Sequence, residues 1–167
     1  MKHDARSAKH ARKEHPVSKV NPIPEGFHSI TPHIIVKGVA NAIEFYKKAF
    51  GAKERCRMSA PDGSIMHAEI QVGSSIIMMA EENEQWGCLA PKGGSPVVLH
   101  LYAPDCDAAM KQAAAAGATI VMPAADMFWG DRYGKITDPF GHSWSIATHI
   151  SDPTPEQMKQ AMAQMCG

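Results

Sequence analysis

The sequence predicts an α+β fold built from two copies of one strand–helix–three-strand unit. In each half, a short strand is followed by apolar residues at helical spacing and then by three strand-like segments. Corresponding landmarks also keep a nearly constant offset, which is the mark of an internal repeat. His33 and His100 are 67 residues apart, and Gly51 and Gly117 are 66 apart.

The first copy begins with a predicted strand at residues 31–36. Val39, Ile43 and Tyr46 then lie on one apolar helical face, and Gly51 is a natural helix stop. Strands are predicted at 53–59, 65–72 and 75–80, separated by turn-forming residues at 61–63 and 73–74.

The second copy repeats this order. A strand is predicted at 96–103, Asp105 is suited to cap a helix, and Gly117 is suited to end it. Strands follow at 119–122, 132–137 and 142–149. Each unit is expected to cover one sheet face with its helix and to leave the other face free to curl toward its twin.

The segments outside the repeat differ in character. Residues 1–26 carry many charges and little periodicity, which predicts a flexible extension. Residues 27–150 form one domain of two modules, about 27–90 and 91–150. Thr154 and Gln157 form a capping box that opens a C-terminal helix within 151–167. The Met and Ala stripe of that helix favours docking on its own core or on that of a partner subunit.

Composition limits the classes of partner. The chain has 167 residues and a formal net charge of zero, although its first 20 residues contain six Lys and Arg against two acidic residues. No aromatic residues interleave those charges, which argues against a nucleic-acid partner. No apolar run approaches the roughly 20 residues that span a bilayer. Four scattered cysteines and an N-terminus without a secretory signal predict a cytoplasmic protein with reduced thiols.

Strand alternation gathers polar residues on one face of each predicted sheet. His67 and Glu69 lie opposite the apolar residues of their strand, and His100 and Tyr102 do the same in theirs. A face this polar is either exposed to solvent or the wall of a cavity. The two-copy arrangement favours the cavity.

His33 and His100 occupy equivalent places in the two copies, so pseudo-twofold symmetry could bring them together. Two neutral imidazoles and a carboxylate would bind a divalent metal such as Zn, Ni, Fe or Mn at an open catalytic site. Glu69 is the best-placed carboxylate and the candidate catalytic group, with Glu81 second. The alternative is that these histidines are hydrogen-bonded wall residues that bind no metal.

Aromatic residues are concentrated in two predicted loops, one with Trp86 and one with Trp129 and Tyr133. Such rings either cap a hydrophobic core or form the lid of a ligand pocket. Arg132 could pair with an anionic ligand or fix its turn by a salt bridge to Asp131 or Asp138. The candidate ligand-binding residues from this reasoning are His67, Trp86, Tyr102, Trp129 and Arg132.

The order of elements, His33 and His100 together resemble the vicinal oxygen chelate superfamily of glyoxalases, bleomycin-resistance proteins and dioxygenases. Residues 66–69, 128–134 and 138–144 resemble its PhnB-like branch. The resemblance covers about residues 28–152. It implies paired βαβββ modules that form an eight-stranded cup, a homodimer and, in the enzymes, a divalent metal.

The ligand set that the resemblance implies is incomplete. His33 and His100 match the first- and fifth-strand ligands, but the carboxylate positions of the fourth and eighth strands fall on Met78 and Ser145. Neither side chain replaces a hard carboxylate ligand. This argues against glyoxalase I activity and leaves Ser145 as a ligand-binding candidate.

Two readings of the function are favoured over a third, which is an oligomeric or regulatory protein that works through its basic tail. One is a metal-dependent lyase, isomerase, transferase or dioxygenase that acts on a small organic substrate through His33, His100 and Glu69. The other is a binding protein that sequesters an aromatic or antibiotic-like compound without chemistry.

Overall fold

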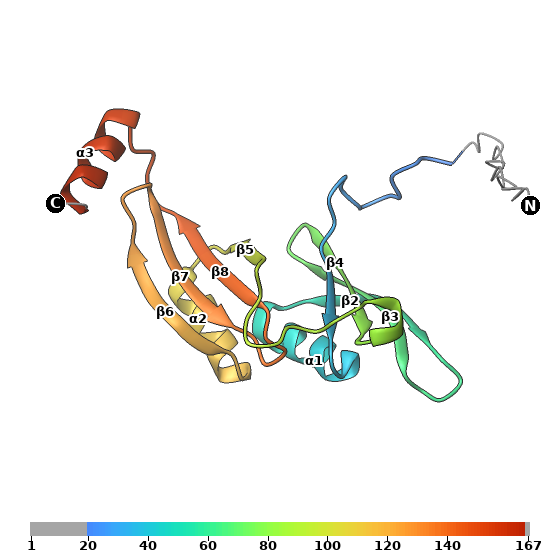
Figure 1. Cartoon of the computed structure of the whole chain (residues 1–167). Coiled ribbons are helices and arrows are strands. Elements are labelled where there is room, and N and C mark those ends of the chain that lie inside the picture. Colours follow the sequence, from blue (N-terminus) through green and yellow to red (C-terminus); the bar gives the residue numbers. More distant parts are fainter. Residues whose placement is uncertain (1–19, 166–167) are drawn as a thin grey trace, which may run out of the picture.

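The computed structural model describes residues 20–165 and contains the two predicted βαβββ modules (Figure 1). The predicted extension at residues 1–26 falls mostly outside the described residues, as does the end of the C-terminal segment. The first module comprises β1 (His33–Val36), α1 (Val39–Phe50), β2 (Lys53–Ser59), β3 (Ile65–Val72) and β4 (Ser75–Glu81). The second comprises β5 (Val98–Tyr102), α2 (Cys106–Ala116), β6 (Thr119–Asp126), β7 (Asp131–Thr137) and β8 (Ser143–His149).

Each module forms its own four-stranded sheet with the same topology. The orders are β1-β4-β3-β2 and β5-β8-β7-β6, with the first strand of each module parallel to the last and the other pairs antiparallel. The prediction of paired βαβββ modules is confirmed. The chain contains the eight strands expected for the cup, and they are divided between two separate four-stranded sheets.

The modules join through their helices. The principal contacts between them run from α1 to α2, and one continuous core includes buried residues of both modules. Trp144 of β8 packs against Phe50 of α1 with ring centroids 4.8 Å apart. This differs from the expectation that the helix-free faces would turn toward each other, because burying the apolar helix faces against one another removes more apolar surface from water.

A buried carboxylate ties the modules together. Asp138, in the turn before β8, is 4% exposed and accepts hydrogen bonds from Tyr46 Oη of α1 at 2.6 Å and Trp144 Nε1 at 3.0 Å. The backbone N–H groups of Phe140 and His142 also donate to it, both at 2.9 Å. Four donors compensate the cost of burying this charge, and one of them comes from the other module.

Two further elements lie outside the modules. The short 3₁₀ helix η1 (Glu84–Trp86) lies in the linker between them, and α3 (Pro155–Met165) follows β8. Figure 1 shows α3 beyond the end of the second sheet, away from α1 and α2. Met162 of α3 is 53% exposed and Met158 is partly buried, so docking of the Met stripe stays a prediction. None of the helices in residues 20–165 has the length and apolar character needed to cross a membrane.

Candidate ligand-binding site

Strand register places the candidate residues on the helix-free face of each sheet, here called its open face. In the first sheet, Met78 is paired with His33 on one side and Glu69 on the other. In the second sheet, Ser145 is paired with His100 on one side and Lys135 on the other. Paired residues on neighbouring strands share a face, so the two open faces have matching sets of positions.

The open face of the first sheet carries a polar cluster. The rings of His33 and His67 are 6.1 Å apart, and His67 Nε2 is 3.4 Å from Glu69 Oε1. Arg55 Nε lies 3.8 Å from the other oxygen of Glu69. Partial burial lowers the pKa of His33, and the neighbouring His67 lowers this pKa further. The predicted carboxylate is therefore engaged by a guanidinium and an imidazole of its own sheet.

The segment that precedes β1 passes over this same face. The guanidinium of Arg55 lies 5.8 Å from the ring centroid of Phe27, in cation–π geometry. A Cβ on Gly26 would lie 3.6 Å from Ile76 Cδ1, which shows how closely the segment approaches β4. An open hollow of about 560 Å³ remains there, lined by residues that include Pro22, Phe27, Thr31, Glu69 and Met78.

The open face of the second sheet carries aromatic rings instead. His100 lies 4.5 Å from Tyr102 in a T-shaped arrangement and 6.1 Å from Tyr133 in a stacked one. Trp129 meets Tyr133 edge to face at 5.6 Å. We refer to His100, Tyr102, Trp129 and Tyr133 as the aromatic platform. Tyr102 is 61% exposed, so the platform is accessible to a ligand.

Asp131 holds two of the four rings of the platform in place. This carboxylate is 5% exposed and accepts hydrogen bonds from Trp129 Nε1 at 3.1 Å and Tyr102 Oη at 3.4 Å. His149 Nδ1 lies 2.9 Å from its second oxygen, and His149 Nε2 lies 3.0 Å from Asp152. The hydrogen bond to Asp131, followed by that to Asp152, raises the pKa of His149. A buried acceptor with three donors limits the rotation of the rings above it.

Ser145 orients a third ring of the platform, that of His100. Its side chain is buried, and its hydroxyl lies 2.7 Å from Nδ1 of His100. Three of the predicted ligand-binding residues, Tyr102, Trp129 and Ser145, thus come together with His100 on one open face. His67 lies on the open face of the other sheet.

Trp86 and Arg132 lie away from the platform. Trp86 is 69% exposed in η1 and lines a separate hollow with Cys88. Arg132 lies on the helix side of the second sheet, where it pairs with Asp107 of α2 and Asp126 of β6. The expected salt-bridge partners, Asp131 and Asp138, were wrong, because alternation along β7 directs Arg132 and Asp131 to opposite faces.

The predicted metal ligands do not converge within one chain. In the described part of the chain, no three His, Cys, Asp or Glu side chains form a group that could hold a metal ion. Glu81, the second candidate carboxylate, instead accepts hydrogen bonds from the backbone N–H groups of Gly38 and Val39 at the start of α1. The donors within residues 20–165 of a single chain do not form a metal centre, and metal binding stays a prediction.

His33 and His100 nevertheless lie near the same seam between the modules. His33 lines a hollow of about 290 Å³ and His100 a neighbouring one of about 300 Å³, and Pro32 and Leu99 line both. The sequence predicts that these distant histidines line one common hollow, which the structure does not show. It does not predict that they border two hollows.

Two residues of the platform region were not predicted as site residues. Asp131 and Lys135 flank Tyr133 at a spacing of two, which places all three on the open face. The signal was therefore present in the alternation along β7. It was obscured because Asp131 also reads as part of a turn with Gly130.

A comparison with models of known protein families shows which superfamily the chain belongs to. The model of the "Glyoxalase/Bleomycin resistance protein/Dioxygenase superfamily" matches residues 26–146, which cover both modules. The chain belongs to this superfamily. The superfamily contains binding proteins as well as enzymes, so membership leaves the activity to be argued from the site.

Known relatives of this superfamily member support the same relationship. An uncharacterized protein of Mycobacterium bovis is 38% identical over 140 residues, which is 81% of this chain and 92% of that protein. The crystal structure of a gene product from Arabidopsis thaliana is similar with a TM-score of 0.61 and 32% identity, covering 72% of this chain and 98% of that one. A PhnB protein from Bacillus cereus shares the fold with a TM-score of 0.58 and 15% identity, over 72% and 99% of the two chains.

Proposed function

We propose that this protein binds a planar aromatic small molecule on the aromatic platform and sequesters it without chemistry. The observation that carries this proposal is the arrangement of His100, Tyr102, Trp129 and Tyr133 around the buried Asp131. Rings fixed before binding lose little conformational freedom when a ligand stacks on them. Each aromatic pair contributes about 0.5–1.5 kcal/mol beyond its buried area.

Lys135 adds a preference for an acidic substituent. It is exposed on the same open face, next to Ser145 in the ladder, and forms no salt bridge with any residue from 20 to 165. An ammonium group beside a ring platform suits an aromatic ligand with a carboxylate or phenolate. The candidate ligand is therefore an aromatic or antibiotic-like compound with an anionic group at one edge.

The test uses 2-naphthoate, a flat two-ring carboxylate, and the full-length protein in a calorimetric titration. Replacing Tyr102 by Ala removes an exposed ring of the platform and is expected to weaken binding about tenfold. Trp86→Ala is the matched control, because it removes an exposed ring elsewhere and should leave the affinity unchanged. Equal binding by Tyr102→Ala and wild type, or no binding at all, contradicts the proposal.

We further propose that the protein is a homodimer in which the open faces of two copies lie opposite each other and the aromatic platform lines the space between them. Glu69 of the first open face and Lys135 of the second occupy matching ladder positions and have opposite charges. Exposed apolar side chains border both faces, among them Met58 at 59% and Val98 at 47%. Pairing of one face with the other would match these charges and cover this surface.

Light scattering coupled to gel filtration tests the dimer. The expected mass is about 36 kDa, twice the chain mass of 18.1 kDa. Glu69→Lys and Lys135→Glu should each weaken the dimer, and the double exchange should restore it. A chain that stays at 18.1 kDa at micromolar concentration argues against the dimer.

Metal-dependent catalysis is tied to that dimer. Because the predicted donors His33, His100 and Glu69 do not form a group in one chain, a second copy would have to complete the set. Metal analysis of protein purified without chelators tests the prediction. If Glu69 is a ligand, Glu69→Gln should lower affinity for a divalent ion about tenfold. Unchanged metal content in this variant removes Glu69 from the set.

A further inference from the structure

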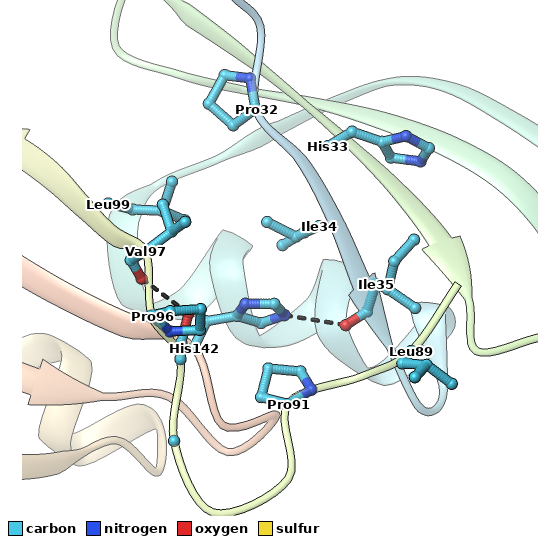
Figure 2. A pocket seen from close by; sticks show the side chains of 12 residues that line it. Pro32, His33, Ile34, Ile35, Leu89, Pro91, Pro96, Val97, Leu99 and His142 are labelled. Carbon is cyan, nitrogen blue, oxygen red and sulfur yellow. Dashed lines mark hydrogen bonds between the residues drawn. The ribbon is translucent and has the colours of Figure 1, made fainter. Parts of the chain in front are cut away.

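The hollow that His33 lines is separate from the aromatic platform and lies in the seam between the modules (Figure 2). We refer to it as the seam hollow. β1 forms one side, the linker residues Leu89 to Val97 form another, and His142 closes the base. Its volume is about 290 Å³. A cavity of about 150 Å³ is enough for benzene, so this one has room for a substituted single ring.

The walls of this seam hollow are apolar and stiff. Pro32, Pro91 and Pro96 contribute three rings with fixed backbone angles, and Ile34 and Leu99 add aliphatic surface. The side chains of Leu89 and Val97 are 54% and 64% exposed, so apolar surface is also left open at its rim. Such a lining gains from contact with an apolar ligand body.

The linker is anchored at Ala90 and Pro91, so this part of the wall is formed before a ligand arrives. Ala90 is buried, and its N–H donates to Glu82 Oε1 at 3.0 Å. A Cβ on Gly141 would lie 3.1 Å from Pro91 Cβ, so the turn before β8 packs directly against the linker. A preformed wall keeps the conformational cost of binding low.

His142 supplies a directional polar group to the hollow, in addition to His33 of β1, which also lines it. Its Nε2 lies 3.0 Å from the carbonyl oxygen of Ile35, which can only accept, so a neutral ring carries its proton on Nε2. Its Nδ1 is then an acceptor. Among the described residues, every side-chain nitrogen or oxygen that is fully buried has a hydrogen-bond partner. Because Nδ1 has no hydrogen-bond partner of its own, it must reach accessible space, and Figure 2 shows this ring at the edge of the hollow.

We propose that the seam hollow binds a neutral single-ring phenol. The ring would lie against Ile34, Pro91 and Leu99, and the hydroxyl would donate to Nδ1 of His142. A phenol fits because it combines an apolar body with one donor. An aromatic ether has no hydroxyl donor and would leave the imidazole acceptor without its hydrogen bond.

The experiment compares phenol with anisole by calorimetric titration of the full-length protein. Phenol is expected to bind in a one-to-one ratio, with anisole about tenfold weaker. Equal affinities for the two compounds, or no binding of phenol at millimolar concentration, overturn the proposal.

Variants locate the binding without disturbing His142, which also holds β1. Val97→Trp places a larger side chain at the rim and is expected to abolish phenol binding, whereas Val121→Trp is the matched control on β6, 61% exposed and far from the hollow's lining. Tyr102→Ala should leave phenol binding intact while it weakens that of 2-naphthoate. Loss of phenol binding in Tyr102→Ala would place the phenol on the aromatic platform and overturn the seam site alone.

Discussion

The two modules share a backbone plan but carry different chemistry at matching positions of their open faces. Around Met78, the first sheet places an imidazole and a carboxylate, and around Ser145 the second places an imidazole and an ammonium group. His67 of the first sheet corresponds to Tyr133 of the second, two residues before Glu69 and Lys135 respectively. The repeat therefore preserves the apolar helix side, while the open faces have diverged into a charged surface and an aromatic one.

The modules also differ in how their helices begin. α1 starts after Gly38 without a side-chain cap of its own, and Glu81 from β4 accepts from its first N–H groups. α2 starts after Asp105, whose side chain accepts from Ala108 N at 2.9 Å. One helix thus depends on a distant strand for its cap, and the other is capped locally.

The largest expected difference in stability is between a buried turn of the second module and an exposed turn of the first. Asp138→Ala leaves four donors without their acceptor, two of them on the buried Tyr46 and Trp144, and should lower the free energy of unfolding by about 3 kcal/mol or more. Asp62 in the first module also accepts hydrogen bonds within a turn, but an exposed one. Asp62→Ala should cost less than about 1 kcal/mol in the same urea titration. Similar losses of unfolding free energy in the two variants would show that the two turns do not differ in this way.

The next difference lies where each helix packs on its sheet. Gly134 of β7 corresponds to Ala68 of β3, and a Cβ on Gly134 would lie 2.2 Å from Met110 Sδ of α2. Gly134→Ala should therefore cost about 1–3 kcal/mol through overpacking.

The double variant Gly134→Ala/Met110→Ala isolates this contact. Its loss of unfolding free energy should be smaller than the sum of the two single losses, because removing the thioether makes room for the new methyl group. Strict additivity would show that the Met110 side chain is not what excludes a Cβ at this position.

Helix capping gives a smaller difference. Glu81→Ala should destabilise the protein by about 1–2 kcal/mol, because it removes the acceptor of two N–H groups at a partly buried helix start. Asp105→Ala removes the acceptor of one exposed N–H and should cost about 1 kcal/mol or less. Thermal unfolding of both variants makes the comparison, and the reverse order would refute it.

The smallest effect is a pH dependence that comes from His149 in the second module. Because its hydrogen bonds raise the pKa of His149, the stabilisation that it gives is complete below its ordinary value of 6.5 and is lost as the pH rises through the raised value. His149→Gln should therefore lower the melting temperature near pH 5.5 and have little effect near pH 9. Asp152→Asn should show a weaker form of the same profile, and a pH-independent loss would exclude the linkage.

Local rules were sufficient for most of the fold. Helical spacing and the glycines at 51 and 117 predicted both helices, and alternation placed His100 and Tyr102 on an open face, whereas Ser145 came from the family resemblance. These rules could not predict which side chains distant in sequence form hydrogen bonds or ion pairs with each other. Tyr46 and Asp138 are 92 residues apart, and Arg132 and Asp107 are 25 apart. Which helix faces meet is decided by total burial across both modules, and no local spacing encodes it.

The hydrogen bond from His142 to Ile35 has a consequence for solubility. β1 borders its sheet, and the carbonyl groups of Pro32 and Val36 are turned toward β4, so that of Ile35 faces outward. An uncovered strand border of this kind invites another chain to add itself by backbone pairing. The imidazole occupies that outward acceptor. A side chain from the second module thus occupies a backbone acceptor on the edge strand of the first module, where another chain could otherwise pair.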